Sequence, residues 1–131
     1  ADEEKPSLQE RVEIAARSGG DAFVSIHYNS AETKASGILT FYYSAGKDKP
    51  LAAAIEHRLA EGGLGLASNG ISFGNFHVVR ENSLPAVLLE LGFLTNERDE
   101  GLARTESYQL AAARAIAQGL EDYFASQEER S

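Results

Sequence analysis

The sequence contains no cysteine among its 131 residues. This absence excludes disulfide bonds, thiolate zinc sites and cysteine nucleophiles. Basic residues are also few, since 12 Lys and Arg stand against 20 Asp and Glu and give a formal net charge of -8. Because Lys and Arg form no stripe that could displace phosphate counterions, we expect no nucleic-acid partner. The acidic balance favours solubility.

Long apolar runs are missing as well. No segment approaches the roughly 20 apolar residues that a membrane-spanning helix needs, so we expect no transmembrane segment. The first residues, Ala1 to Glu4, lack the basic and apolar regions of a signal peptide. What is present, 43% hydrophobic and 24% charged residues, is close to the globular average. The length favours a single domain over residues 1–131.

Several catalytic signatures are also absent. The chain has no G-x-S-x-G elbow, no phosphate-binding loop and no H-E-x-x-H motif. It therefore lacks the sequence signatures of serine hydrolases, nucleotide-binding enzymes and zincins. Residues 70–74 are rich in glycine but contain no lysine and precede a predicted strand. We interpret this stretch as a flexible loop.

Three segments have helical patterns. The first follows a capping box of Ser7 and Glu10 and stops at Gly19 and Gly20. The second begins at Pro50, and the third starts near Thr105. The apolar positions that recur at helical spacing are Leu51, Ile55 and Leu59 in the second helix, and Leu110, Ala113, Ala117, Leu120 and Phe124 in the third. We expect residues 127–131 to form a frayed tail.

Four short runs, at residues 22–26, 37–43, 76–79 and 86–89, are predicted strands. The first is apolar on both faces and should lie inside the sheet. Residues 29–36 are too short for a helical crossover, so the first two strands are expected to be antiparallel or not adjacent. The alternation of helices and strands predicts a three-layer α/β domain with a mostly parallel twisted sheet and helices on both faces.

His27 and Glu90 are the main candidate site residues. Each follows an apolar run, V-S-I before His27 and V-L-L before Glu90. In open α/β sheets the reactive crevice lies beyond the carboxyl ends of the strands, so these two residues can converge. Burial among apolar neighbours raises the pKa of a carboxyl group towards the range of a general base. A histidine and a carboxylate so placed suit metal-assisted hydrolysis.

Each candidate also has a structural interpretation. His27 could form a hydrogen bond to a backbone group at the end of its strand. Glu90 could cap the backbone that follows its strand. His57 falls off its helix's apolar stripe and is expected to be exposed. His77 lies on a predicted strand, and we interpret it as a histidine whose hydrogen bonds are satisfied within the fold in preference to a metal ligand. Arg80 at that strand's end could bind a substrate carboxylate or form a surface salt bridge.

The segments S-I-H-Y-N at 25–29, F-H-V-V-R at 76–80 and P-A-V-L-L-E-L-G-F-L-T-N at 85–96 together resemble the zinc-dependent N-acetylmuramoyl-L-alanine amidases of bacterial cell-wall turnover. With L-Q-E-R-V-E-I-A at 8–15, the order and spacing match from Leu8 to about Phe124. The resemblance implies a peptidoglycan hydrolase that cleaves the amide between N-acetylmuramic acid and the L-alanine of the stem peptide. It implies that His27 is a zinc ligand, that Glu90 is the acid/base residue, and that Asn29 and Arg80 contact substrate or support the site.

One departure from the family pattern matters. The family's other two zinc ligands are a histidine in a glycine-rich D-P-G-H-G-G segment and a glutamate on the following helix, and this chain has no such segment. The resemblance therefore implies a partial amidase domain, truncated at its N-terminal strands, with two of three protein ligands missing. Because catalytic zinc usually has three protein ligands, we expect weak or absent zinc binding and an inactive isolated chain. The truncation should expose a sheet edge through which the chain could self-associate.

Two alternatives stay open. One is a non-catalytic relative that binds cell-wall fragments or regulates hydrolysis. The other is a metal-free hydrolase that uses Glu90 with a second carboxylate, but Asp99 and Glu100 are expected on a polar turn. The resemblance further implies a peptidoglycan or muropeptide substrate and a location in the cell wall, extracellular space or periplasm, where autolysins act.

Overall fold

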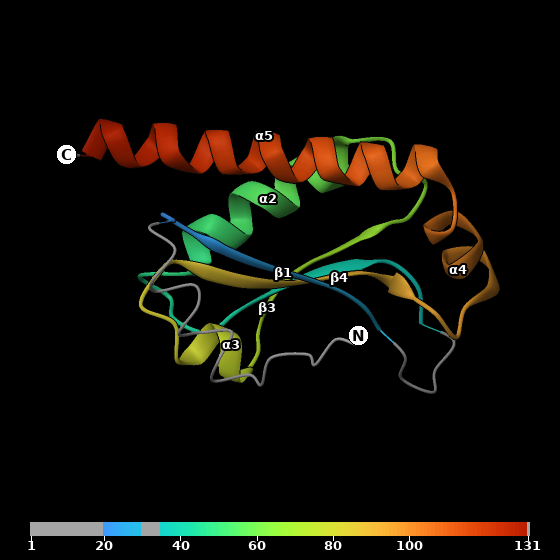
Figure 1. Cartoon of the computed structure of the whole chain (residues 1–131), viewed down its shortest axis with the longest axis horizontal. Coiled ribbons are helices and arrows are strands. Elements are labelled where there is room, and N and C mark those ends of the chain that lie inside the picture. The colour runs from blue at the N-terminus through green and yellow to red at the C-terminus, as the bar shows by residue number, and fades with distance from the viewer. Residues whose placement is uncertain (1–19, 30–34, 131) are drawn as a thin grey trace, which may run out of the picture.

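The computed structural model describes residues 20–29 and 35–130, which form a mixed sheet with helices packed against it (Figure 1). The elements, in chain order, are β1 Phe23–Asn29, β2 Ile38–Tyr42, α2 Lys49–Glu61, β3 Ser68–Phe73, α3 His77–Arg80, β4 Ala86–Phe93, α4 Glu97–Ala103 and α5 Glu106–Arg130. The strand order is β1-β4-β2-β3. β1 is parallel to β4 and β2 is parallel to β3, whereas β2 and β4 are antiparallel. The predicted three-layer α/β class is confirmed.

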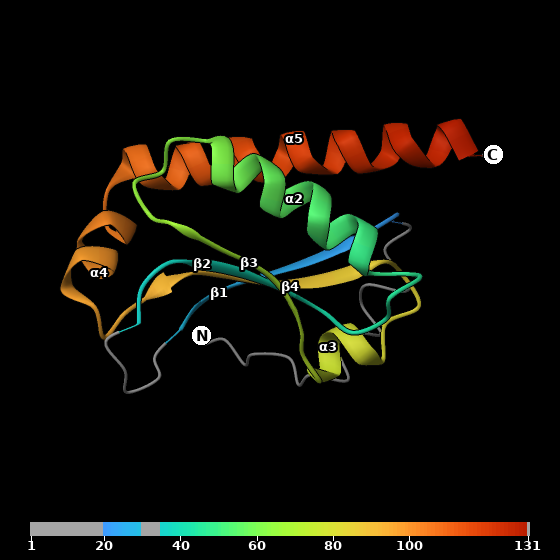
Figure 2. The same cartoon turned by 180° about the vertical axis from the view of Figure 1, so that it is seen from behind.

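The two long helices cover one face of the sheet (Figures 1 and 2). The stripe predicted for α2 is confirmed, because Leu51, Ile55 and Leu59 are all buried. Pro50 lies in the first turn of this helix, where its missing N–H group costs no hydrogen bond. These side chains form the main core with β4 residues that point to the same face, among them Val87 and Leu89.

The opposite face carries a smaller core. Val78 and Val79 of α3 pack against Ala86 and Leu88 of β4. Phe76, Phe41, Tyr43 and Phe23 complete this cluster. Within the described residues, α3 is the one helix on this face, so the sheet is covered here only near the start of β4 (Figure 2).

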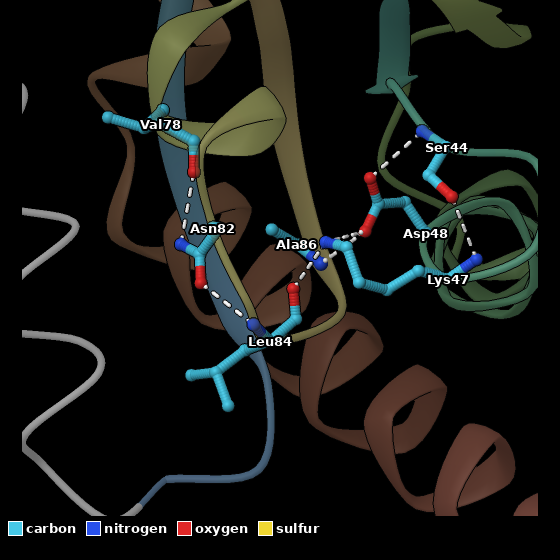
Figure 3. A network of polar contacts seen from close by, with 7 residues as sticks. All are labelled: Ser44, Lys47, Asp48, Val78, Asn82, Leu84 and Ala86. Carbon is cyan, nitrogen blue, oxygen red and sulfur yellow. Dashed lines mark hydrogen bonds and ion pairs between the residues drawn. The ribbon is translucent and has the colours of Figure 1, made fainter.

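A buried carboxylate anchors the start of β4 (Figure 3). Asp48, which is fully buried, accepts hydrogen bonds of 3.0 Å from the backbone N–H groups of Ser44 and Ala86. The Lys47 Nζ atom lies 2.6 Å from Asp48 Oδ1 and donates to the Leu84 carbonyl at 2.6 Å. These bonds join the N-terminus of α2 to β4 and so fix the position of the strand that carries Glu90.

The sequence prediction for residues 70–79 was wrong. The expected loop at 70–74 overlaps β3, an edge strand in which Ile71 and Phe73 are the apolar residues, so its apolar alternation is too short to stand out in the sequence. The expected strand at 76–79 is instead α3. Val78 and Val79 are consecutive and both buried in one cluster, which a strand with alternating faces cannot achieve. The Asn82 side chain donates to the Val78 carbonyl and ends this helix (Figure 3).

β1 corrects another prediction, since it lies at an edge of the four-stranded sheet and not inside it. Ile26 is accordingly 53% exposed. The expectation that the first two strands are not adjacent holds, because β4 lies between β1 and β2. The predicted helix at 7–18 lies outside the described residues.

The C-terminal helix was predicted correctly, but the apolar stripe chosen for it was not the buried one. Leu110 is 56% exposed and Phe124 is 36% exposed. The buried positions are Tyr108, Ala112, Ala115, Ile116 and Tyr123. A close helix contact decides this orientation, because a Cβ atom on Gly119 would lie 2.6 Å from Ile55 Cα. The helix extends to Arg130 and so includes most of the tail expected to fray.

Candidate active site

His27 and Glu90 are direct neighbours in the sheet. They are aligned partners of the parallel pair β1 and β4, in which neighbouring strands lie about 4.8 Å apart. Aligned residues of parallel strands point to the same face, here the face that carries α3. Both lie within the carboxyl-terminal halves of their strands. The structure thus brings together the two residues that the sequence singled out, although it places them inside the strands and not beyond their ends.

Glu90 has an unusual environment for a carboxylate. β2 pairs with the edge of β4 that does not face β1, and its Leu39 is the residue aligned with Glu90. Its Oε2 atom is buried and has no hydrogen-bond partner within the described part of the chain. Burial raises the pKa of this carboxyl above its ordinary value. Glu90 therefore holds a proton more readily than a solvated glutamate, and one of its oxygen atoms is available to a ligand.

His27 is exposed and held by a neighbour on its own strand. The Ser25 Oγ atom lies 2.8 Å from His27 Nε2. Because side chains alternate along a strand, residues two apart share a face, and the serine can orient the imidazole ring. The pattern Ser-x-His on a strand was the available signal for this contact, and sequence reasoning did not use it. The other ring nitrogen, Nδ1, takes no part in that bond.

Asn29 and Arg80 are placed less close to this pair. Asn29 lies two residues beyond His27, after a register shift in β1, and its carbonyl accepts from Leu94 N–H at 2.7 Å. Arg80 is at the end of α3 and not of a strand. Its hydrogen-bond partners are Glu81, Asn75 and the His77 ring. None of these contacts joins Arg80 to His27 or Glu90.

The other histidines lie elsewhere. His57 is exposed, as predicted, and pairs with Glu61 one turn along α2 at 3.3 Å. His77 is on α3 instead of a strand, which corrects the prediction. In the described ranges, no three His, Asp or Glu side chains are grouped so that they could hold a metal ion. His27 and Glu90 alone do not fit a complete zinc site.

Asp99 is a supporting residue that sequence reasoning missed. The expected polar turn is helix α4, and Asp99 is fully buried. It accepts from the backbone N–H groups of Phe93 and Gly37 at 3.0 Å, which joins the end of β4 to the start of β2. The available signal was the Asn-x-x-Asp spacing after a strand, since Asn96 caps the helix by accepting from Asp99 N–H.

The fold of this chain is that of the catalytic domains of N-acetylmuramoyl-L-alanine amidases. The catalytic domain of CwlV, an amidase from Bacillus (Paenibacillus) polymyxa, is 37% identical and superimposes with a TM-score of 0.86 over 92% of this chain and 66% of that domain. An amidase from Clostridium difficile 630 is 35% identical, with a TM-score of 0.86 over 92% of this chain and 67% of that one.

Sequence relatives agree. An uncharacterized cell wall amidase of Bacillus anthracis is 40% identical over 90% of this chain and 24% of its own length. N-acetylmuramoyl-L-alanine amidase LytC of Bacillus subtilis is 37% identical over 90% of this chain and 24% of its own length. Residues 1–122 match the family model described as N-acetylmuramoyl-L-alanine amidase. The chain therefore belongs to the N-acetylmuramoyl-L-alanine amidase family, and it spans about a quarter of these two curated relatives.

Proposed function

We propose that this chain takes part in the hydrolysis of peptidoglycan at the amide bond between N-acetylmuramic acid and the L-alanine of the stem peptide. The observation that carries the proposal is the alignment of His27 with Glu90 on adjacent strands, with a buried and unpartnered Glu90 oxygen. Membership of the amidase family supports the choice of substrate. The names of the relatives support a location at the cell wall, outside the cytoplasm.

Glu90 is proposed as the acid/base residue. The leaving group of amide hydrolysis is an amine, which must be protonated as the C–N bond breaks. A carboxyl whose pKa is raised by burial can hold that proton at a pH where a solvated glutamate has lost it. Its neighbour His27 fixes one side of the space in which the substrate amide would lie. Asn29 and Arg80 are proposed as substrate contacts on the basis of the family resemblance.

His27 is proposed as one ligand of a catalytic zinc ion. A bound zinc ion would activate water and polarise the amide carbonyl. The described residues do not fit such a site on their own, since they offer no group of three ligands. We therefore propose that the isolated chain binds zinc weakly and does not hydrolyse peptidoglycan by itself. The same observation favours a second candidate function, a non-catalytic module that binds or regulates at the cell wall.

A chimera with a solved relative tests the proposal. This chain would replace the matching two-thirds of the CwlV catalytic domain, and the release of free L-alanine amino groups from purified peptidoglycan would be measured. We expect hydrolysis by the chimera and a loss of about 100-fold or more in Glu90→Gln, because general acid–base groups contribute about that much. His57→Ala serves as a control, since this exposed histidine lies away from the pair.

Two results would count against the proposal. Hydrolysis by the chimera that survives Glu90→Gln would remove Glu90 from the reaction. Release of amino groups by the unmodified chain alone, at the rate of the chimera, would contradict the proposed inactivity. A folded but inactive chimera, together with sedimentation of the chain on peptidoglycan, would favour the binding module instead.

A further inference from the structure

The backbone of β4 contains a β-bulge directly after Glu90. His27 of β1 is aligned with Glu90. Two residues further along β1, Asn29 is aligned with Phe93, which is three residues further along β4. β4 therefore has one residue more than β1 over this stretch, and Phe93 takes the place beside Asn29 that the preceding residue would have in a regular strand. Bulges are over-represented next to active sites, where they change the direction of a side chain.

The bulge depends on a glycine. Gly92 has a φ angle of 132°, in a region that residues with a side chain rarely adopt. It is also buried, and a Cβ atom at this position would lie 3.3 Å from Leu66 Cδ1 and 3.4 Å from Asp99 Cβ. A backbone conformation of this kind persists only where the surrounding structure holds it. The contacts on either side of Gly92 therefore decide the shape of β4 at this point.

Tyr108 of α5 holds the peptide before Gly92. Its hydroxyl donates to the Leu91 carbonyl at 2.7 Å, and this contact is buried. The side chain of Leu91 is fixed as well, because it is part of the main core. Removing the tyrosine hydroxyl would leave a buried carbonyl without this partner, which is costly. Tyr108 thus fixes both the position and the rotation of the residue that follows Glu90.

Asp99 holds the peptide after Gly92, from helix α4 beside the end of β4 (Figure 1). One of its carboxylate oxygens, Oδ2, accepts from the N–H groups of Phe93 and Gly37, each at 3.0 Å. The other oxygen, Oδ1, accepts from Ser36 Oγ at 2.5 Å. Both oxygens of Asp99 are therefore occupied. The bulge is tied through them to the segment that leads into β2.

The orientation of Glu90 depends on this part of the backbone. Among the described residues, the pairing of β4 with β2 ends at Glu90, which is aligned with Leu39. Beyond that point the side chains of Tyr108 and Asp99 bind the strand. The buried Oε2 atom of Glu90 has no hydrogen-bond partner among the described residues, so no such bond orients it. Its direction is set by the backbone, because backbone angles decide which side-chain rotamers are allowed.

We propose that Tyr108 and Asp99 are positioning residues for Glu90, which fix the bulge at Gly92 and thereby hold the Glu90 carboxyl beside His27. This proposal rests on the acid/base role proposed for Glu90. An acid/base group must lie within hydrogen-bond reach of the proton that it transfers. A displacement of about 1 Å can lower a rate about 100-fold, so two buried contacts away from the reacting atoms can control the reaction.

The rotamer of Glu90 tests the proposal in the full chain. Three-bond coupling constants and cross-strand NOEs to His27, measured by NMR, report the χ1 angle of Glu90. We expect a single rotamer in the wild type and averaging between rotamers in Tyr108→Phe, which removes one hydroxyl group. Tyr123→Phe is the matched control, because it makes the same change at another buried tyrosine of α5, and it should leave the Glu90 rotamer unchanged.

Two substitutions of Asp99 separate its hydrogen bonds from its charge. Asp99→Ala removes the acceptor and should cause the same averaging at Glu90. Asp99→Asn removes the charge but keeps one oxygen, which can still accept from the N–H groups of Phe93 and Gly37. The asparagine variant should therefore keep the wild-type rotamer of Glu90. Equal averaging in both variants would assign the effect to charge and overturn the proposal.

Kinetics of the CwlV chimera connect the rotamer to the reaction. Tyr108→Phe should lower kcat about tenfold or more and leave KM within about twofold, because it disturbs the acid/base group and not substrate binding. A Glu90 rotamer that Tyr108→Phe and Asp99→Ala leave unaltered, or an unchanged kcat despite averaging, would overturn the proposal. A folded chimera that is inactive without these substitutions would count against the acid/base role itself, and the rotamer measurement would still decide whether Tyr108 and Asp99 position Glu90.

Discussion

At the scale of single residues, the buried carboxylates separate into two kinds. Asp48, Asp99 and Glu56 accept hydrogen bonds from backbone or hydroxyl groups and thereby hold elements together. The Oε2 atom of Glu90 is buried without any partner in the described residues. Because a buried polar atom without a partner costs free energy, its persistence needs a compensating role, and contact with a ligand supplies one. This contrast supports Glu90 as a functional residue.

Glu56 provides a prediction about pH. Burial raises the pKa of this carboxyl above its ordinary value of 4.5, although Ser68 and Thr40 donate to it. Just above pH 4.5 the folded state therefore binds more protons than the unfolded state, so the contribution of Glu56 to stability falls as the pH rises through that window. In Glu56→Gln the free energy of unfolding should decline less over this range, by at most about 1.4 kcal/mol per pH unit for one proton.

The measurement is urea denaturation at several pH values for the wild type and Glu56→Gln, because other titrating groups cancel in the difference. Two curves with the same slope above pH 4.5 would show that Glu56 titrates as it does in the unfolded chain.

Residue-level prediction from the sequence succeeded where a polar side chain interrupts an apolar run. His27 and Glu90 stood out for that reason, and the structure aligns them. Their catalytic and metal-binding roles stay predictions. Asp99 was missed because its burial depends on helix α4, which folds it back against β2 and β4. Nothing in its local sequence, E-R-D-E, is apolar.

At the scale of elements, the long helices and the central strand β4 were predictable, since each has a strong apolar pattern. The prediction failed for short elements whose state depends on their neighbours. β3 is a polar edge strand that β2 pairs with, and α3 is a single turn that its contact with β4 stabilises. The orientation of α5 could not be predicted from periodicity, because the helix has two apolar stripes and the glycine contact with α2 selects one.

That glycine contact gives a prediction at this scale. Gly119→Ala places a Cβ atom 2.6 Å from Ile55 Cα, so α2 and α5 must move apart. We expect a loss of about 1–3 kcal/mol in the free energy of unfolding, the usual range for overpacking. Gly101→Ala in α4 meets nothing within 4 Å and should gain about 0.5–1 kcal/mol from helix propensity. Thermal and urea denaturation of both variants would measure this; equal stability of the two would contradict the close contact.

At the scale of the whole molecule, the described residues cover the two faces of the sheet unequally. α2 and α5 bury the main core on one face, whereas on the face that carries His27 and Glu90 the described residues form a helix only at α3 (Figures 1 and 2). No helix within the described ranges is long and apolar enough to cross a bilayer. The predicted fold class held because element order constrains an α/β sheet, but the edge position of β1 did not follow from its apolar sequence, which is typical of an interior strand.

The central claim is that this chain supplies one zinc ligand, His27, and an acid/base residue, Glu90, without completing a metal site. Zinc titration of the purified chain by calorimetry, run beside His27→Ala, tests it most directly. We predict no stoichiometric binding tighter than about 10 µM, and heats that are nearly the same in the variant, because a single histidine holds zinc weakly. Stoichiometric binding at about 1 µM or tighter that disappears in His27→Ala would contradict the claim, since other groups of the chain would then complete the site.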